Sequence, residues 1–331
     1  MNSSSSSTML KSEPQPATSG LLARCPVCTR AMGLLDPSAV SAPACELCGF
    51  VLRNHRGVWQ ALAPDRERHF RQFMREYQQV RAREGRGSPA PDYYLSLPFT
   101  DLTGRNAWQW SIRSVSFRYL LRKVLPPLEE FHTRPLDILD IGAGNGWLSY
   151  RLAQRGHHPA AVDLLDNDAD GLGAARHYYC SLGWLFPRFR AEMDRLPLAD
   201  GQFDLAIFNA SLHYSPDYCN TIREAVRCLR PGGHLLILDS PFYRREESGR
   251  RMVGERKRQF TQTFGFASDS IASREFLTAA ALDEVSRSLH LRWKTRKPWY
   301  GWRWALRPVK ARLLGRREPS KFYIFFAEVA G

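Results

Sequence analysis

The sequence predicts an α/β fold with a doubly wound sheet, and three observations carry this prediction. Leu136 to Ala153 reads as a short strand rich in Ile and Leu, a glycine-rich turn and an amphipathic helix. A second short strand ends at Asp163. Apolar strands from Phe203 to Asn209 and up to Asp239 continue the alternation, which is the order that produces a parallel sheet covered by helices.

The turn after the first strand suits a ligand that approaches the backbone closely. Gly142, Gly144 and Gly146 alternate with other residues shortly after Asp140, and glycine is needed where φ is positive or a ligand packs on the backbone. The spacing Gly-x-Gly-x-Gly differs from the Gly-x-Gly-x-x-Gly of dinucleotide folds. A nicotinamide-dependent oxidoreductase is therefore a distant alternative. Asp163 lies where a carboxylate can accept hydrogen bonds from a ribose diol.

Together with Glu192 to Pro197 and Arg230 to Leu235, these motifs resemble the class I S-adenosylmethionine-dependent methyltransferases of the type 11-like group. The resemblance implies a seven-stranded Rossmann-like sheet, S-adenosylmethionine as cofactor, and methyl transfer as the reaction. It assigns the methionine end of the cofactor to Asp140 and the ribose to Asp163. The other implied contacts are Gly142, Gly144 and Gly146 beneath the methionine end, Leu164, Glu192 and Met193 around the adenine, and Asn209 after the fourth strand.

The N-terminal part divides into a tail and a metal-binding module. Residues 1 to 20 are rich in serine and proline and are expected to be disordered. Residues 21 to 63 contain two Cys-x-x-Cys pairs, a spacing typical of a zinc ribbon in which four thiolates fill the coordination of the metal. A redox pair and coincidence are the alternatives. The predicted structural zinc ligands are Cys25, Cys28, Cys45 and Cys48.

Residues 64 to 130 are expected to form a helical linker or lid. From Asp65 to Glu84 the apolar residues recur every three or four positions, which predicts an amphipathic helix with a solvated polar face. A second helix is expected from Ala107 to Val124, stopped by two prolines. The candidate lid residues, which alternatively pack the extra helices on the sheet, are Tyr93, Tyr94 and Arg105.

Residues 131 to 331 form the predicted methyltransferase domain, and His213 is its candidate general base. A structural role for this histidine is the alternative. Asn209 is not followed by Pro-Pro-aromatic, and no Pro-Cys nucleophile is present. Methylation of an exocyclic adenine nitrogen or of cytosine carbon 5 is therefore not expected.

Arg292 to Arg317 has the most unusual composition in the chain. This segment contains ten basic residues, four tryptophans and no acidic residue. Tryptophan and basic side chains favour a membrane interface with anionic headgroups, but the same pairing can stack on bases and hold phosphates. A third interpretation buries the tryptophans as a helical cap and leaves the charges solvated.

The composition limits the partners without identifying them. The 331-residue chain has a formal net charge of +14, which favours an anionic partner such as nucleic acid, lipid or an acidic substrate. It contains no apolar run near the roughly 18 residues of a membrane-spanning helix and no basic-then-apolar leader. We therefore expect a cytoplasmic protein, with peripheral membrane contact as an extension. The expected methyl acceptor is a small or lipid-linked molecule; the alternatives are an RNA base and a non-catalytic partner subunit with this fold.

Overall fold

A computed structural model describes residues 20–36 and 42–329 of the chain. All but the last residue of the expected N-terminal tail therefore lies outside the described residues. The strands of the described part are β1 Leu22–Arg24, β2 Ala31–Leu34, β3 Arg53–His55, β4 Val58–Gln60, β5 Asp137–Ile141, β6 His158–Asp163, β7 Arg188–Arg190, β8 Phe203–Asn209, β9 Leu229–Leu238, β10 Lys294–Arg296 and β11 Ile324–Glu328.

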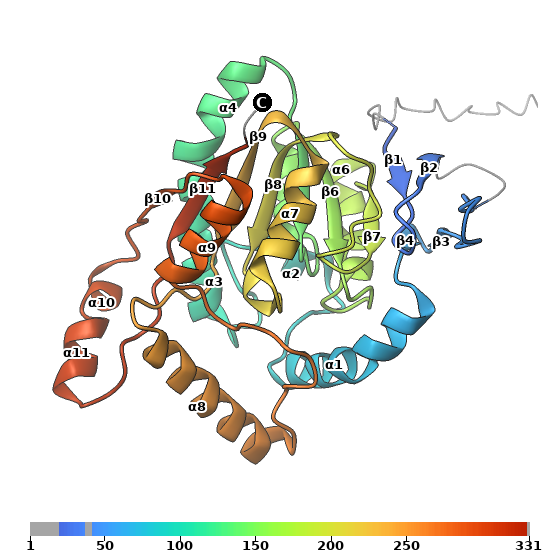
Figure 1. The fold of residues 1–331 in the computed structure, drawn as a ribbon. Coiled ribbons are helices and arrows are strands. Elements are labelled where there is room, and N and C mark those ends of the chain that lie inside the picture. The colour runs from blue at the N-terminus through green and yellow to red at the C-terminus, as the bar shows by residue number, and fades with distance from the viewer. Residues whose placement is uncertain (1–19, 37–41, 330–331) are drawn as a thin grey trace, which may run out of the picture.

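Nine of these strands form one sheet in the order β10-β11-β9-β8-β5-β6-β7-β4-β3 (Figure 1). The strands from β9 to β4 are parallel to one another, whereas β11 runs antiparallel between β9 and β10. Strand β5 lies between β6 and β8, so the strand order reverses at β5. This is the doubly wound sheet that the sequence predicts, and such sheets bind ligands at the point of reversal.

Helices cover both faces of the sheet. They are α1 Pro64–Arg83, α2 Pro91–Ser96, α3 Ala107–Tyr119, α4 Leu125–His132, α5 Trp147–Gln154, α6 Tyr179–Leu182, α7 Tyr218–Cys228, α8 Glu246–Phe264, α9 Ala279–Leu289, α10 Trp302–Ala305 and α11 Arg307–Leu313. Successive strand residues point to opposite faces. Ile138 and Leu205 pack in the core that contains residues of α3, α4 and α5, while Leu139 and Ala206 pack in the core with α7 and α9. Burial on both faces explains why these strands read as continuous apolar runs.

The cysteine-containing segment is joined to the edge of the sheet. Strand β4 pairs in parallel with β7, with Trp59 opposite Phe189. Strand β1 forms a small antiparallel sheet with β2, and Ala23 bridges to Leu198. Trp59, Phe189, Ala23 and Leu198 are buried in one core. The segment therefore packs as an extension of the sheet.

The structure corrects one expectation about the helices. The chain does not leave the helical conformation at Pro126 and Pro127, because α3 continues through a π-helical turn, Leu120–Val124, into α4. Both prolines lie in the first turn of α4. Proline is tolerated there because the first amide groups of a helix have no intrahelical partner. Among residues 20–36 and 42–329, no helix has the length and apolar character needed to cross a bilayer.

Candidate functional site

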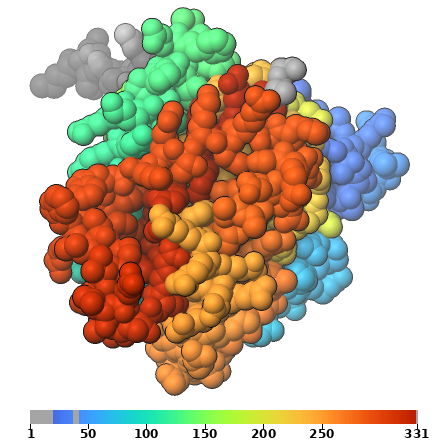
Figure 2. Space-filling model, turned by 60° about the vertical axis from the view of Figure 1, so that its left-hand side comes forward, coloured from blue at the N-terminus to red at the C-terminus, as the bar shows by residue number. Residues whose placement is uncertain are grey.

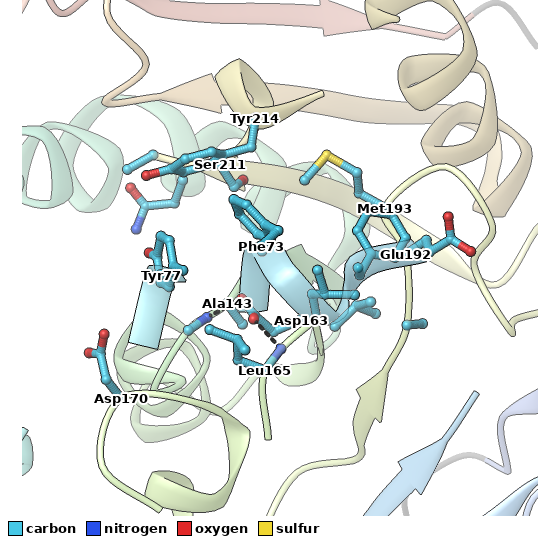
Figure 3. A pocket seen from close by; sticks show the side chains of 18 of the residues that line it. Phe73, Tyr77, Ala143, Asp163, Leu165, Asp170, Glu192, Met193, Ser211 and Tyr214 are labelled. Carbon is cyan, nitrogen blue, oxygen red and sulfur yellow. Dashed lines mark hydrogen bonds between the residues drawn. The ribbon is translucent and has the colours of Figure 1, made fainter. Parts of the chain in front are cut away.

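A cavity of about 380 Å³ opens where the sheet reverses its strand order (Figure 3). Asp140 of β5, Asp163 of β6 and Asn209 of β8 contribute to its lining from the carboxyl ends of the strands. All the implied cofactor residues line this cavity except one, Gly146. Gly146 instead precedes α5 with φ of +76°, and a Cβ there would lie 3.0 Å from the Phe186 ring. Its role in the structure is to shape the turn.

Asp140 presents an unpartnered oxygen within the protein interior. Its side chain is fully buried, and Oδ2 accepts a hydrogen bond of 2.8 Å from the Ser149 hydroxyl. Within the described residues, the buried Oδ1 has no hydrogen-bond partner. Burial raises the pKa of Asp140 to about 7. A buried carboxylate oxygen without a partner is costly, so this atom is suited to accept from a donor supplied by a ligand.

The glycine turn passes close to the end of β8. Gly142 has φ of +77°, and a Cβ at this position would lie 2.2 Å from Cβ of Ser211. The Ser211 hydroxyl donates to the Ile141 carbonyl at 2.5 Å, which fixes the two loops against each other. Any side chain at Gly142 would therefore displace the loop after β8 and narrow the cavity.

Asp163 is held by the backbone on both sides of the cavity floor. Its Oδ2 accepts from the Gly144 amide and its Oδ1 from the Leu165 amide, each at 2.8 Å. Burial raises the pKa of Asp163 to about 6, against the lowering effect of the two amides. Each carboxylate oxygen has capacity for a further hydrogen bond. The residue thus lies in the cavity with a fixed orientation and unused acceptor capacity (Figure 3).

Glu192 has a partner that sequence reasoning did not foresee. Its carboxylate is nearly inaccessible and receives Arg66 of α1 in a forked ion pair, with Nη2 to Oε2 at 2.6 Å and Nε to Oε1 at 2.9 Å. The carboxylate points away from Asp163 in Figure 3. Leu164 and Met193 line the cavity nearby. Glu192 therefore fastens α1 to the site, whatever else it contacts.

Helix α1 forms the roof of the cavity. Phe73 and Tyr77 of this helix line the cavity. The ring centre of Tyr214 lies 6.3 Å from that of Phe73 and 5.9 Å from that of Tyr77. At the far end of the helix, Arg81 forms an ion pair with Asp170. The sequence analysis identified this apolar stripe but assigned the rest of the helix to solvent. The alternation of aromatic and arginine residues along α1 was the available signal.

The residues that the sequence analysis placed in a lid lie elsewhere. Tyr93 and Tyr94 are fully buried among the residues packed against α3 and α5. The Tyr94 hydroxyl donates to the Ala169 carbonyl at 2.7 Å, and Arg105 is exposed. None of the three lines the cavity. The two tyrosines have the packing role that was the alternative.

Arg113 brings a positive charge to the cavity without an acidic partner. Its guanidinium lies 4.7 Å from the Trp110 ring centre, and both residues of α3 line the cavity. Among the ion pairs of the described ranges none involves Arg113, although the charge of Asp239 acts on it from a distance. Burial and the nearby Arg86 and Arg81 lower the pKa of Arg113 to about 10. The side chain remains charged at neutral pH and is available to an anionic group.

His213 lies behind the cavity and is not among the residues that line it. Its Nδ1 is 3.4 Å from the Ser240 hydroxyl, and its ring lies 4.4 Å from the Tyr214 ring centre. Burial, with Arg113 and Arg256 nearby, lowers the pKa of His213 to about 3. The imidazole is therefore neutral at physiological pH and supports Tyr214, which does line the cavity.

The four predicted zinc ligands converge in the ribbon. The sulfur atoms of Cys25, Cys28, Cys45 and Cys48 all lie within 4.8 Å of one another. Each pair closes a turn: the Thr29 amide donates to the Cys25 carbonyl and the Gly49 amide to the Cys45 carbonyl, both at 2.9 Å. Thr29 and Gly49 have positive φ, 65° and 72°. Two such turns bring four thiols to one point, as tetrahedral zinc coordination requires.

Comparison with known proteins identifies a domain within the chain. Residues 139–237 match the family model described as "Methyltransferase domain". An arsenite methyltransferase of Aquipseudomonas alcaligenes is 36% identical over 110 residues, which are 31% of this chain and 32% of that protein. A malonyl-[acyl-carrier protein] O-methyltransferase of Buchnera aphidicola is 31% identical over 137 residues, 40% of this chain and 51% of that protein.

A fatty-acid O-methyltransferase of Mycolicibacterium smegmatis is 32% identical over 103 residues, 31% of this chain and 36% of that protein. The chain thus spans about a third to a half of the length of these relatives. The matched residues run from within β5 to most of β9 and include the strand ends that line the cavity.

Proposed function

We propose that this protein is an S-adenosylmethionine-dependent methyltransferase. The observation that carries the proposal is the meeting, in one cavity at the reversal of the sheet, of the unpartnered Oδ1 of Asp140, the glycine turn and the fixed carboxylate of Asp163. The residues fit the cofactor. Asp140 suits an ammonium group, Asp163 suits a ribose diol, and the lack of a side chain at Gly142 lets the turn pack closely against Ser211.

S-adenosylmethionine, when bound, supplies an activated methyl group on a sulfonium. The residues of the chain then have to bind, orient and exclude water. Ser149 holds the Asp140 carboxylate by one oxygen and leaves the other for the methionine end. The amides of Gly144 and Leu165 orient Asp163 toward the ribose, while Leu164 and Met193 flank the adenine. Phe73 and Tyr77 of α1 cover the cavity and keep it dry.

The methyl acceptor that fits best is a small or lipid-linked molecule, which we propose on two grounds. Two of the relatives are named for malonyl-[acyl-carrier protein] and fatty acids, acceptors that carry acyl chains. Beyond the strand ends, Trp110, Tyr214 and Ile271 give the cavity an apolar and aromatic surface, beside charged residues such as Arg113. An RNA base is the alternative acceptor, motivated by the net charge of +14.

We also propose that the cysteine cluster holds one structural zinc ion. Four sulfur ligands complete a tetrahedral shell and leave no position for water or substrate. The cluster belongs to the segment whose β4 pairs with β7 at the sheet edge. The metal would stabilise that edge and take no part in methyl transfer.

The acceptor and the reaction are tested by transfer of a tritiated methyl group from S-adenosylmethionine into a fractionated cell lysate. We expect label in the lipid or small-molecule fraction with the wild-type protein and none with Asp163→Ala. Label in RNA would overturn the acceptor class. No transfer to any fraction, with cofactor binding intact, would favour the non-catalytic partner subunit.

A further inference from the structure

The segment around α10 and α11 carries an apolar stripe that points away from the protein. Trp302, Leu306, Val309 and Leu313 follow one another at intervals of four, three and four positions, the spacing of one face of a helix. Their exposed fractions are 75%, 57%, 55% and 81%. An amphipathic helix of a globular protein normally buries this face against the core. Here the face is presented to the surroundings, and Trp299 at 60% and Leu314 at 53% exposure enlarge it.

The exposed orientation of the stripe is held by contacts on the opposite side of the segment. The Trp304 ring stacks on Phe322 at 5.3 Å between ring centres, and the Arg307 guanidinium lies 3.8 Å from the Trp304 ring centre. Arg317, after α11, forms an ion pair with Glu255 of α8. Trp304 and Arg317 thus hold the segment against the rest of the protein, and the apolar stripe faces outward. Figure 2 shows it standing out at the left of the molecule in orange-red.

The charges that the segment itself carries all have one sign. From Val285 to Arg317 the chain has no acidic residue. The exposed basic residues of the segment are Arg303, Lys310, Arg312 and Arg316. An apolar stripe with tryptophan, flanked by exposed lysine and arginine, is the pattern of helices that lie in the interface of an anionic membrane. Nucleic acid would be attracted by the charges, but its phosphate backbone would not cover the exposed leucine and valine side chains.

The segment is also connected to the edge of the sheet where the cavity opens. Tyr300, just before α10, shares a hydrogen bond of 2.9 Å with the Ser116 hydroxyl, which donates to Asp239 at the end of β9. In Figure 1, α10 and α11 project at the lower left, α8 lies at the bottom, and α1, which lines the cavity, lies at the lower right of the molecule. A surface that contacted α10 and α11 from below would therefore lie on the same lower side of the molecule as α1.

We propose that residues 299–314, which we term the interfacial segment, anchor the protein to the surface of a membrane containing anionic phospholipid. The stripe inserts its tryptophan and aliphatic side chains at the level of the headgroups, and the flanking arginine and lysine residues contact the phosphates. The consequence that a lipid-borne acceptor is delivered to the cavity rests on the proposed methyl transfer. The membrane contact itself does not.

The test is cosedimentation of the full-length protein with vesicles of phosphatidylcholine alone and with vesicles containing phosphatidylglycerol. We expect the protein to bind the anionic vesicles, with a blue shift of tryptophan fluorescence. The double variant Leu306→Asp/Leu313→Asp should bind at least about tenfold more weakly, because it removes apolar area from the bilayer. The matched control is Phe131→Asp in α4, whose ring is 76% exposed but lies outside the segment; it should bind as the wild type does.

A second variant separates the charge from the stripe. Lys310→Glu/Arg312→Glu should weaken binding to anionic vesicles and leave the weak binding to neutral vesicles unchanged. The proposal is overturned if the wild type does not bind anionic vesicles, if the leucine variant binds as well as the control, or if structured RNA binds and only the charge variant weakens it. Affinity for S-adenosylhomocysteine, measured on the same variants, should stay at the wild-type value. If the wild type does not bind S-adenosylhomocysteine at all, that result contradicts the proposed function and leaves the membrane contact unaffected.

Discussion

At the scale of single residues, the account depends on two acids with raised pKa values. Asp140 and Asp163 have pKa values of about 7 and about 6 because both carboxyls are buried. A protonated carboxyl carries no charge to balance an ammonium group, and one of its oxygens becomes a hydrogen-bond donor. The proposed cofactor contacts therefore require both residues to be ionised.

This leads to a prediction about pH. The affinity for S-adenosylmethionine should rise as the pH increases from 5 to about 8 and level off above that pH, because both acids have to lose their protons before binding. Below pH 6 both acids are largely protonated and binding should be about tenfold or more weaker. Titration calorimetry at a series of pH values checks this. An affinity that does not change across the range would show that neither acid is a ligand.

Arg113 supports a second prediction, about the cofactor's carboxylate. Its unpaired guanidinium faces a cavity whose other end is assigned to adenine. Arg113→Met should weaken S-adenosylmethionine about tenfold, since a charge-assisted hydrogen bond contributes about 1.5–3 kcal/mol. It should not change the affinity for methylthioadenosine, which lacks the amino-acid end. An equal loss of affinity for both ligands would contradict this assignment. If neither affinity changes, Arg113 does not contact the cofactor and is free to bind the methyl acceptor.

At the scale of elements, α1 acts as a roof held at both ends. Arg66 forms an ion pair with Glu192 near the start of the helix, and Arg81 forms one with Asp170 near its end. Aromatic rings pack along the middle of the helix. Glu192 was assigned to the adenine by resemblance, and its pairing with Arg66 gives it the additional task of closing the site. Because α1 lines the cavity, we expect movement of this helix to accompany the entry and release of a ligand as large as S-adenosylmethionine.

The third prediction concerns this closure. Arg66→Ala should increase the dissociation rate of S-adenosylhomocysteine about fivefold or more, because the helix loses a nearly buried ion pair. Stopped-flow tryptophan fluorescence measures the rate, since Trp110 and Trp147 line the cavity. Arg68→Ala, on the exposed side of the same helix, is the matched control. A slower dissociation in Arg66→Ala would instead mean that freed Glu192 binds the ligand better.

The sequence was most informative where local pattern and fold agree. The strand and turn that carry Asp140 and the strand that ends at Asp163 were predicted because apolar runs and glycine spacing are local signals. Strand β4 was not foreseen as part of the main sheet, because three residues give no pattern and their partner, β7, is far away in the chain. The role of α1 as a roof was missed for a related reason: periodicity shows which face is apolar but not what that face covers.

At the scale of the whole molecule, the cysteine-containing segment forms part of the main sheet. The β3–β4 hairpin forms one edge of the sheet, and Trp59 of β4 is buried. We therefore expect loss of the proposed zinc ion to destabilise this edge of the sheet as well as the cysteine cluster.

The fourth prediction tests this coupling. The wild type should contain one zinc ion per chain, and Cys45→Ser should contain none. The variant should also melt at least about 4 °C lower, because a loss of about 2 kcal/mol shifts the Tm of a domain of this size by roughly that amount. Cys180→Ser, an exposed thiol in α6, should match the wild type. If the wild-type protein has the same Tm with and without zinc, the proposal that the metal stabilises the sheet is wrong.

The central claim is that one cavity at the reversal of the sheet binds S-adenosylmethionine through Asp163. Titration calorimetry of the zinc-loaded, full-length protein tests it most directly, with Asp163→Ala as the variant and Asp283→Asn, an exposed acid on α9, as the control. The account predicts one binding site per chain, with affinity lowered about tenfold or more in Asp163→Ala and unchanged in Asp283→Asn. The absence of binding to the wild-type protein, or equal binding to Asp163→Ala, would contradict it.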